Sequence, residues 1–204
     1  GLTAATTGLN EKSAKAAGVK YERIVGYWGN HAGYYPGAQN MLVKVLFDPD
    51  SGKILGAQIV GPSGVDKRID VFATAIRAGM TGADLAEVEL SYAPPYGSAK
   101  DPVNMCGFMI ENIMNGIVKQ YHWDEVDDLP RDGSVTILDV RNPGEFERGH
   151  IPGAVNIALD GIRDHLDELD KSKPVYVNCF SGMRSYIACR ILSGSGFDCY
   201  NLSG

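Results

Sequence analysis

The feature that most constrains the fold is a short apolar run that ends in a cysteine and passes through a tight loop into a helical pattern. The run is Val175 to Asn178, Cys179 follows it directly, and helical spacing resumes between Ile187 and Leu192. A similar apolar run spans Val135 to Val140, and apolar residues at helical spacing lie between the two runs, from Leu159 to Leu169. Strands that alternate with helices pair in parallel. We therefore predict an α/β domain with a parallel sheet.

The loop after Cys179 has the composition of an anion site. A loop that leads from a strand into a helix turns backbone amides toward its centre, and the helix adds its positive end. The anion is predicted to be the sulfur of Cys179, because a helix N-terminus and the nearby Arg184 favour the nucleophilic thiolate. Ser181 and Ser185 can donate hydrogen bonds to a terminal sulfur, and Gly182 lets the loop curl. The alternative from the loop alone is a cysteine that merely ends a buried strand.

The first half of the chain has a different pattern. Apolar and polar residues alternate from Met41 to Val60 on both sides of the turn-forming segment Asp48 to Gly52, which predicts a hairpin. Helical spacing follows from Val65 to Ala78, and a second helix is expected from the N-cap candidate Asp101 through Ile117. We predict an α+β domain in which helices pack on an antiparallel sheet.

A stiff loop precedes the second of these helices. It runs from Ser91 to Pro102, and the pair Pro94 and Pro95 holds it extended. Its two tyrosines, Tyr92 and Tyr96, are either ordinary hydrophobic anchors or a surface presented to a ligand or partner. The periodicity does not decide between these two interpretations.

The charge and residue composition of the chain argue against some classes of binding partner. A formal net charge of -6 without a basic run argues against nucleic acid and against an anionic membrane surface. No apolar stretch approaches the ~20 residues that span a bilayer. The four cysteines form no CxxC pair and the four histidines show no metal-ligand spacing, so we expect no metal site. Four cysteines could form two disulfides, but a chain of this length does not need them, so we expect free thiols in a reducing cytoplasm. Cys106 lies on an apolar helix face, which favours a structural role.

The second half resembles rhodanese-like domains. The resemblance lies in Asp139 to Phe146, in Gly149 to Ile157, and in the CxxxxRS loop that begins at Cys179. It implies that Cys179 carries sulfur as a persulfide, that Asp139 and Arg141 brace the site, and that His150 is structural. It also implies that the amide cradle consists of Phe180, Ser181, Gly182, Met183 and Arg184. Related phosphatases have one more residue between cysteine and arginine, and the shorter loop here suits a single sulfur.

The first half resembles the dimerisation domain of flavin-dependent pyridine nucleotide-disulfide oxidoreductases, in the branch of coenzyme A disulfide reductase, persulfide reductase and NADH oxidase. The resemblance rests on His31 to Ala38, Gly56 to Gly61 and Ser91 to Tyr96. It implies a homodimer through residues 1–118. It also implies that tyrosines of one subunit contact substrate at the flavin site of the other; the candidates are Tyr34, Tyr92 and Tyr96.

Together these resemblances indicate the C-terminal part of a larger cytoplasmic reductase. We expect the dimerisation domain over residues 1–118 and a C-terminally truncated rhodanese-like domain over residues 125–204. No GxGxxG fingerprint occurs, so no cofactor is expected here, and FAD and NAD(P)H would belong to the full-length protein. The expected substrate is a low-molecular-weight persulfide or disulfide such as a coenzyme A species. The alternative is a dimerisation and interaction module with an inert rhodanese-like domain.

Overall fold

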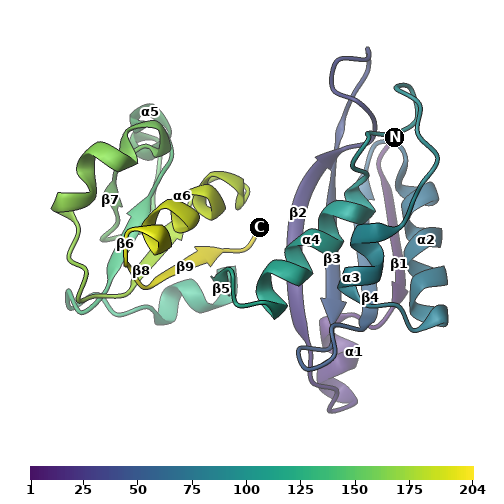
Figure 1. Cartoon of the computed structure of the whole chain (residues 1–204), viewed down its shortest axis with the longest axis horizontal. Coiled ribbons are helices and arrows are strands. Elements are labelled where there is room, and N and C mark those ends of the chain that lie inside the picture. The colour runs from purple at the N-terminus through teal and green to yellow at the C-terminus, as the bar shows by residue number, and fades with distance from the viewer. The chain divides into compact units, whose positions relative to one another are not determined.

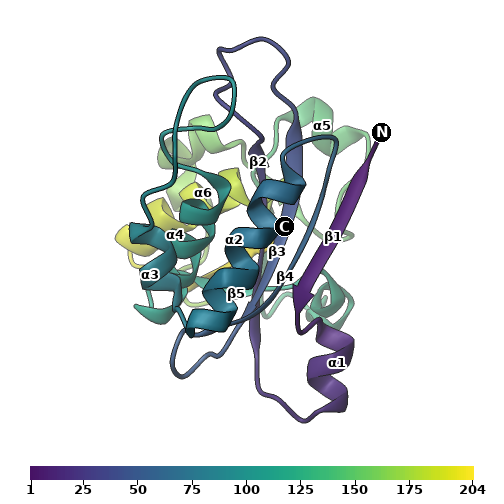
Figure 2. The same ribbon diagram turned by 90° about the vertical axis from the view of Figure 1, so that its right-hand side faces the viewer.

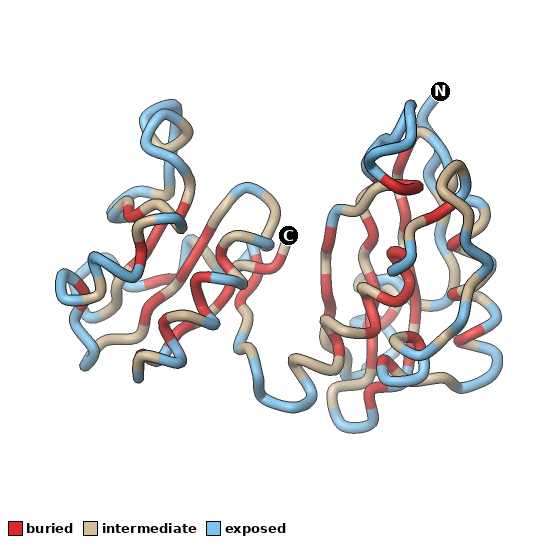
Figure 3. Tube along the Cα trace, turned by 45° about the horizontal axis from the view of Figure 1, so that its top comes forward, coloured by how far each residue is buried: buried red, intermediate tan, exposed pale blue.

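The computed structural model describes residues 1–204 and divides into two compact units, Gly1–Asn115 and Gly116–Gly204. Each unit has its own sheet (Figure 1). Buried residues concentrate along the strands of both sheets and on the helix faces that cover them (Figure 3).

The first unit is built on a four-stranded antiparallel sheet in the order β1-β4-β3-β2. Its strands are β1 (Thr3–Gly8), β2 (Glu22–Gly29), β3 (Asn40–Phe47) and β4 (Ile54–Gly61). The predicted hairpin is β3 with β4, closed by hydrogen bonds from the Asp48 N–H to the Lys53 carbonyl (2.9 Å) and from the Gly52 N–H to the Asp48 carbonyl (2.8 Å). Gly52 has a φ of +73°, which explains why glycine ends this turn.

Helices cover one face of this sheet (Figure 2). They are α2 (Val65–Ala78) and α4 (Pro102–Met114). The short helix α3 (Gly82–Glu87) packs against α4, and another short helix, α1 (Glu11–Ala16), joins β1 to β2. The Asp101 side chain caps α4 as predicted, accepting from the Val103 N–H. The predicted extension of α4 to Ile117 was wrong. The helix ends at Met114 because Asn115 caps it and Gly116 takes a φ of +66°.

The second unit is built on a five-stranded parallel sheet in the order β5-β9-β8-β6-β7. Its strands are β5 (Lys119–Tyr121), β6 (Thr136–Asp139), β7 (Val155–Asn156), β8 (Val175–Asn178) and β9 (Cys199–Leu202). An antiparallel sheet with helices followed by a parallel α/β sheet confirms the predicted fold class. The segment expected to separate the domains contains β5, whose pairing with β9 draws it into the second unit.

Two α-helices and two 3-10 segments complete this unit: α5 (Pro143–Glu147), α6 (Met183–Gly194), η1 (Trp123–Asp128) and η2 (Leu159–Glu168). The spacing from Leu159 to Leu169 predicted a helix. The structure has 3-10 turns there, with a non-helical break at His165. In α6, Ile187 is 40% exposed, because Ser185, Ala188, Cys189 and Leu192 form the buried face instead.

The two faces of the parallel sheet carry separate apolar clusters. One cluster packs under α6 and includes Leu138, Val177 and Leu192. The other contains Tyr121, with Tyr176 and Tyr200 packed against it. Tyr176 and Tyr200 are register neighbours on β8 and β9, and their rings stack with centroids 4.8 Å apart and an interplanar angle of 12°. Burial on both faces is what a central parallel sheet requires.

Candidate active site

Cys179 lies where β8 ends, at the carboxyl edge of the parallel sheet. The neighbouring strand holds this end in place through a hydrogen bond from the Val140 N–H to the Asn178 carbonyl (3.0 Å). The Cys179 side chain is half-buried, with one side against the core under α6. The hydroxyl of the buried Ser185 donates to the Cys179 sulfur at 3.3 Å. A partly accessible sulfur with a fixed donor beside it suits a nucleophile.

The loop from Cys179 to α6 is closed by Gly182. This residue has a φ of +84° and is the N-cap of α6, so the positive end of the helix lies in the loop that carries the cysteine. A β-carbon at Gly182 would lie 3.3 Å from the Leu202 carbonyl oxygen and 3.2 Å from the Gly204 nitrogen. The site therefore requires glycine both for its backbone conformation and for the close approach of the chain after β9.

The other predicted loop residues differ in their surroundings. Phe180 is 75% exposed and Met183 is also exposed, so both side chains extend into solvent at the mouth of the loop. Ser181 is half-buried and makes no hydrogen bond to Cys179. Of the two predicted serine donors, only Ser185 forms a hydrogen bond to the Cys179 sulfur.

Arg184 is held by a carboxylate that sequence reasoning did not assign to the site. Its two terminal nitrogens donate to the Glu145 oxygens at 2.7 and 2.8 Å, a bidentate pair between α6 and α5. The hydrogen bonds from Arg184, with one from the Asn142 N–H, lower the pKa of Glu145 to about 2. The same pair raises the pKa of Arg184. The only sequence signal was local, since Asn142 and Glu145 have the spacing of a capping box.

Asp139 and Arg141 form a second charged pair at the end of β6. The Arg141 guanidinium donates to both Asp139 oxygens, at 2.6 Å from Nη2 and 3.0 Å from Nε, and Nη2 also reaches the Gly149 carbonyl at 2.7 Å. Burial opposes the charge on Asp139, but the hydrogen bonds from Arg141 outweigh it and lower the pKa of the carboxyl. Asp139 pairs in register with Asn178, the residue before the cysteine. This pair therefore lies beside the base of the loop.

His150 packs on Phe146, and the remaining cysteines are buried. The His150 ring stacks on Phe146 at 3.7 Å, and its Nδ1 lies 2.9 Å from the Phe146 carbonyl oxygen. Cys106, Cys189 and Cys199 are buried, and none of the four cysteines forms a disulfide. Burial raises the pKa of the Cys106 thiol well above its ordinary value.

The predicted tyrosine candidates lie in the first unit. The Tyr34 and Tyr92 hydroxyls are 2.9 Å apart, although the two residues are far apart in sequence. This hydrogen bond raises the pKa of Tyr92. The Tyr96 ring is exposed and makes no hydrogen bond to either hydroxyl; its carbonyl accepts from Lys67 at 3.4 Å. The structure thus brings together two of the three tyrosines.

Comparison with known families follows the division into two units. Residues 1–101 match the family described as the pyridine nucleotide-disulphide oxidoreductase dimerisation domain, and residues 122–204 match the rhodanese-like domain. The chain joins these two domains. The half-buried Cys179 therefore belongs to the rhodanese-like domain, and the Tyr34–Tyr92 pair belongs to the dimerisation domain.

Individual relatives match all or part of the chain. The crystal structure of reduced Bacillus anthracis CoADR-RHD is similar over 100% of this chain and 36% of its own, with 50% identity and a TM-score of 0.95. The NAD-dependent persulfide reductase from A. fulgidus is similar over the same shares, with 37% identity and a TM-score of 0.85. The coenzyme A disulfide reductase of Staphylococcus haemolyticus is 47% identical over 85 residues, which are 42% of this chain and 19% of that protein. The chain thus spans about a third or less of each relative.

None of the helices is long and apolar enough to cross a membrane. No group of three or more histidine, cysteine, aspartate or glutamate side chains comes together with the geometry of a metal site.

Proposed function

We propose that the rhodanese-like domain carries sulfane sulfur on Cys179. The thiolate attacks the outer sulfur of a persulfide donor, the sulfur–sulfur bond of the donor breaks, and the donor leaves as a thiolate while Cys179 becomes a persulfide. The hydrogen bond from Ser185 to the Cys179 sulfur is the observation that carries the proposal. The half-exposed position of this thiol, beside the start of α6, gives a donor access to it.

The charged residues around the loop each have a specific role in this proposal. Arg184, oriented by Glu145, supplies positive charge near the terminal sulfur, and Asp139 with Arg141 fixes the end of β6 next to the loop. The cradle residues Phe180 to Arg184 contribute backbone amides, and Ser185 contributes a hydroxyl. The persulfide anion then rests among preorganised donors, which is the general basis of electrostatic stabilisation in a site.

For the full-length protein we infer an FAD-dependent, NAD(P)H-dependent reductase of disulfides or persulfides such as coenzyme A species. It would be a cytoplasmic homodimer through residues 1–118, with Tyr34, Tyr92 and Tyr96 facing the substrate at the partner's flavin site. The match to the dimerisation domain and the names of the relatives support this inference. The residues present do not fit a dinucleotide, because neither unit has the glycine-rich strand-loop-helix that holds its pyrophosphate.

The proposal is tested by exposing the chain to thiosulfate, glutathione persulfide or coenzyme A persulfide and mapping the products by mass spectrometry. We expect a ~32 Da adduct on Cys179 and none on the buried cysteines. Ser185→Ala removes the hydroxyl and should lower the yield, whereas Ser193→Ala, a control in the same helix, should not. An unmodified Cys179 beside a modified Cys106 would refute the sulfur-carrier role and leave the inert interaction module as the better interpretation.

A further inference from the structure

Two loops of the dimerisation domain meet at the Tyr34–Tyr92 pair. The first tyrosine loop is residues 30–39, between β2 and β3, and the second tyrosine loop is residues 88–101, between α3 and α4. Besides the two hydroxyls, the loops are joined by a hydrogen bond from the Ala32 N–H to the Gly97 carbonyl (2.8 Å). Tyr34 is 77% exposed, so packing alone does not fix its ring. The position of the pair therefore depends on how the bases of the two loops are held.

Asn30 closes the base of the first tyrosine loop. Its N–H donates to the Gln39 carbonyl at 2.9 Å, and its side-chain oxygen accepts from the Gln39 N–H at 2.9 Å. Its side-chain amide also donates to the Ser63 hydroxyl. Asn30 is buried, and these bonds tie both ends of the loop to one residue.

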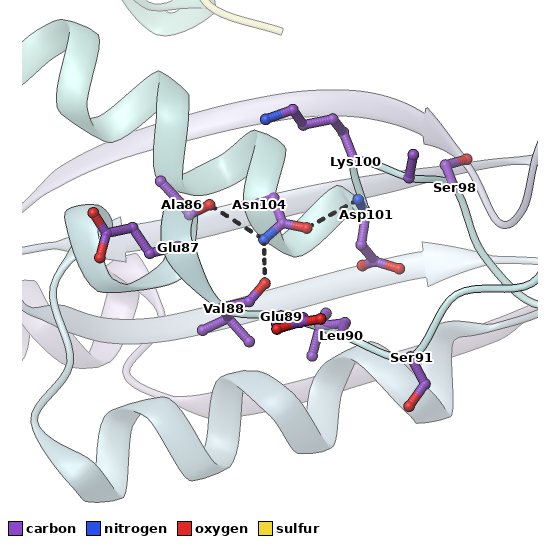
Figure 4. Close-up of a pocket in the computed structure, with 11 residues that line it drawn as sticks. Ala86, Glu87, Val88, Glu89, Leu90, Ser91, Ser98, Lys100, Asp101 and Asn104 are labelled. Carbon is purple, nitrogen blue, oxygen red and sulfur yellow. Dashed lines mark hydrogen bonds between the residues drawn. The ribbon is translucent and has the colours of Figure 1, made fainter.

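Asn104 does the same for the second tyrosine loop (Figure 4). Its side-chain nitrogen donates to the carbonyl of Val88 (2.8 Å) at the start of the loop and to that of Ala86 (3.4 Å) in the last turn of α3. Its side-chain oxygen accepts from the Asp101 N–H (3.0 Å) at the end of the loop. Asn104 is also buried, so each loop is closed by a buried asparagine.

Arg68 of α2 connects the two bases. Its Nη2 donates to the Asn30 carbonyl at 2.7 Å and to Asp101 Oδ2 at 2.7 Å, and its Nε donates to both Asp101 oxygens at 3.3 and 3.2 Å. Arg68 is 1% exposed and Asp101 is 3% exposed. Asn30, Arg68, Asp101 and Asn104 thus form one continuous buried network, called the loop clamp below.

The chemistry of the loop clamp favours a positional role. A buried ion pair adds little stability compared with apolar residues of the same size, because desolvation offsets the attraction. A guanidinium, however, has donors in a rigid plane and can bind a carboxylate and a carbonyl at once, which an ammonium on a flexible stem does less well. Arg68 uses this property to fix the distance between the two loop bases.

We propose that Arg68 is a positioning residue for the Tyr34–Tyr92 pair. It acts through Asn30 on one tyrosine and through Asp101 on the other, without touching either hydroxyl. This inference rests on the proposed place of the tyrosines at a reductase site. It adds that their spacing is set from within the dimerisation domain by the buried guanidinium.

The test is a titration of Tyr92 in the chain labelled with 3-fluorotyrosine and observed by ¹⁹F NMR, with Tyr34→Phe and Tyr92→Phe used for assignment. In the parent chain the pKa of the labelled Tyr92 should stand above that of free 3-fluorotyrosine, because its hydroxyl is bonded to that of Tyr34. Arg68→Lys should move the midpoint down to that of Tyr34→Phe. Arg23→Lys is the matched control, since Arg23 is also buried and paired with an acid, Glu11, in the same unit.

A second variant serves as the control for misfolding. Arg68→Met combined with Asp101→Asn removes both charges together and leaves a side-chain oxygen to cap α4, so no unpaired charge is buried. This double variant should also lose the raised Tyr92 midpoint while keeping the parent circular dichroism. A raised midpoint that survives in either folded variant would overturn the proposal.

Kinetic assays on the full-length protein distinguish a failure of this inference from a failure of the proposed function. Arg68→Lys should lower kcat of the reductase about as much as Tyr92→Phe does, with KM little changed and with adduct formation on Cys179 intact. If Tyr92→Phe leaves the reductase rate unchanged, the proposed role of the tyrosines fails, and the NMR titration alone decides whether Arg68 positions them. A parent rate in Arg68→Lys beside a slowed Tyr92→Phe would contradict the positioning role.

Discussion

Arg184, at the end of the cysteine loop, forms an ion pair with Glu145 through both of its terminal nitrogens. The carboxylate has two opposing effects. It partly neutralises the positive charge that a persulfide would feel, and it fixes the guanidinium in one orientation. Orientation should dominate, since a freed arginine on this partly exposed surface would turn toward water, where a single charge is strongly screened.

Glu145→Gln should therefore slow sulfur transfer to Cys179 by about tenfold, which corresponds to about 1.4 kcal/mol of lost transition-state stabilisation. Glu147→Gln, an exposed neighbour in α5, should leave the rate unchanged. Stability gives a second readout. The pKa of Glu145 falls from 4.5 to about 2 in the folded chain, so its contribution is complete above about pH 4.5 and is lost as the pH falls through about 2. The parent and Glu145→Gln should thus differ in free energy of unfolding at pH 7, and this difference should shrink below pH 4.5 in urea titrations.

At the residue scale, the sequence predicted contacts that are local and missed those that are not. Ser185 lies in the first turn of α6, directly after the short loop that begins at Cys179, so its contact with the sulfur could be inferred from their closeness in sequence. Glu145 lies on another element, and its spacing from Asn142 indicated only a helix cap. Likewise, the sequence named Tyr34 and Tyr92 but gave no sign that Arg68 bridges the loops that carry them.

At the scale of elements, α6 has a glycine with positive φ at each end, Gly182 at its start and Gly196 just beyond its end. Gly182→Ala and Gly196→Ala should each destabilise the chain by about 1–2 kcal/mol, because alanine is strained in the left-handed region. Only Gly182→Ala should also block persulfide formation, since its β-carbon would push against Leu202 and shift the loop, whereas a β-carbon at Gly196 meets nothing within 4 Å. Urea denaturation and mass mapping of Cys179 measure the two effects, and equal labelling in both variants would contradict this account.

The elements that could be predicted have a strong hydrophobic periodicity and clear signals at both ends. The hairpin β3–β4 and the helix α2 have both, and the structure has them where they were expected. The strand β1 was not foreseen, because Thr3–Gly8 is an edge strand of small and polar residues with little apolar alternation. The strand β5 has three residues in a polar stretch and depends on β9, far along the chain, so no local pattern could indicate it.

At the scale of the whole molecule, each unit encloses its own core, which predicts two independent unfolding transitions. Ile59→Ala and Leu138→Ala each truncate a fully buried side chain, one in each core, and each should lower stability by about 2–5 kcal/mol. Ile59→Ala should shift only the transition of the dimerisation domain, and Leu138→Ala only that of the rhodanese-like domain. Calorimetry on both variants measures this. A single transition that moves with either substitution would refute it.

The near-parallel rings of Tyr176 and Tyr200 have an optical consequence. Two chromophores of the same kind at 4.8 Å couple their electronic transitions, so they should contribute a paired signal to near-ultraviolet circular dichroism. Because these rings sit on adjacent central strands of one sheet, that signal would vanish as soon as the strands separate. It offers a label-free spectroscopic marker for the folded state of the rhodanese-like domain.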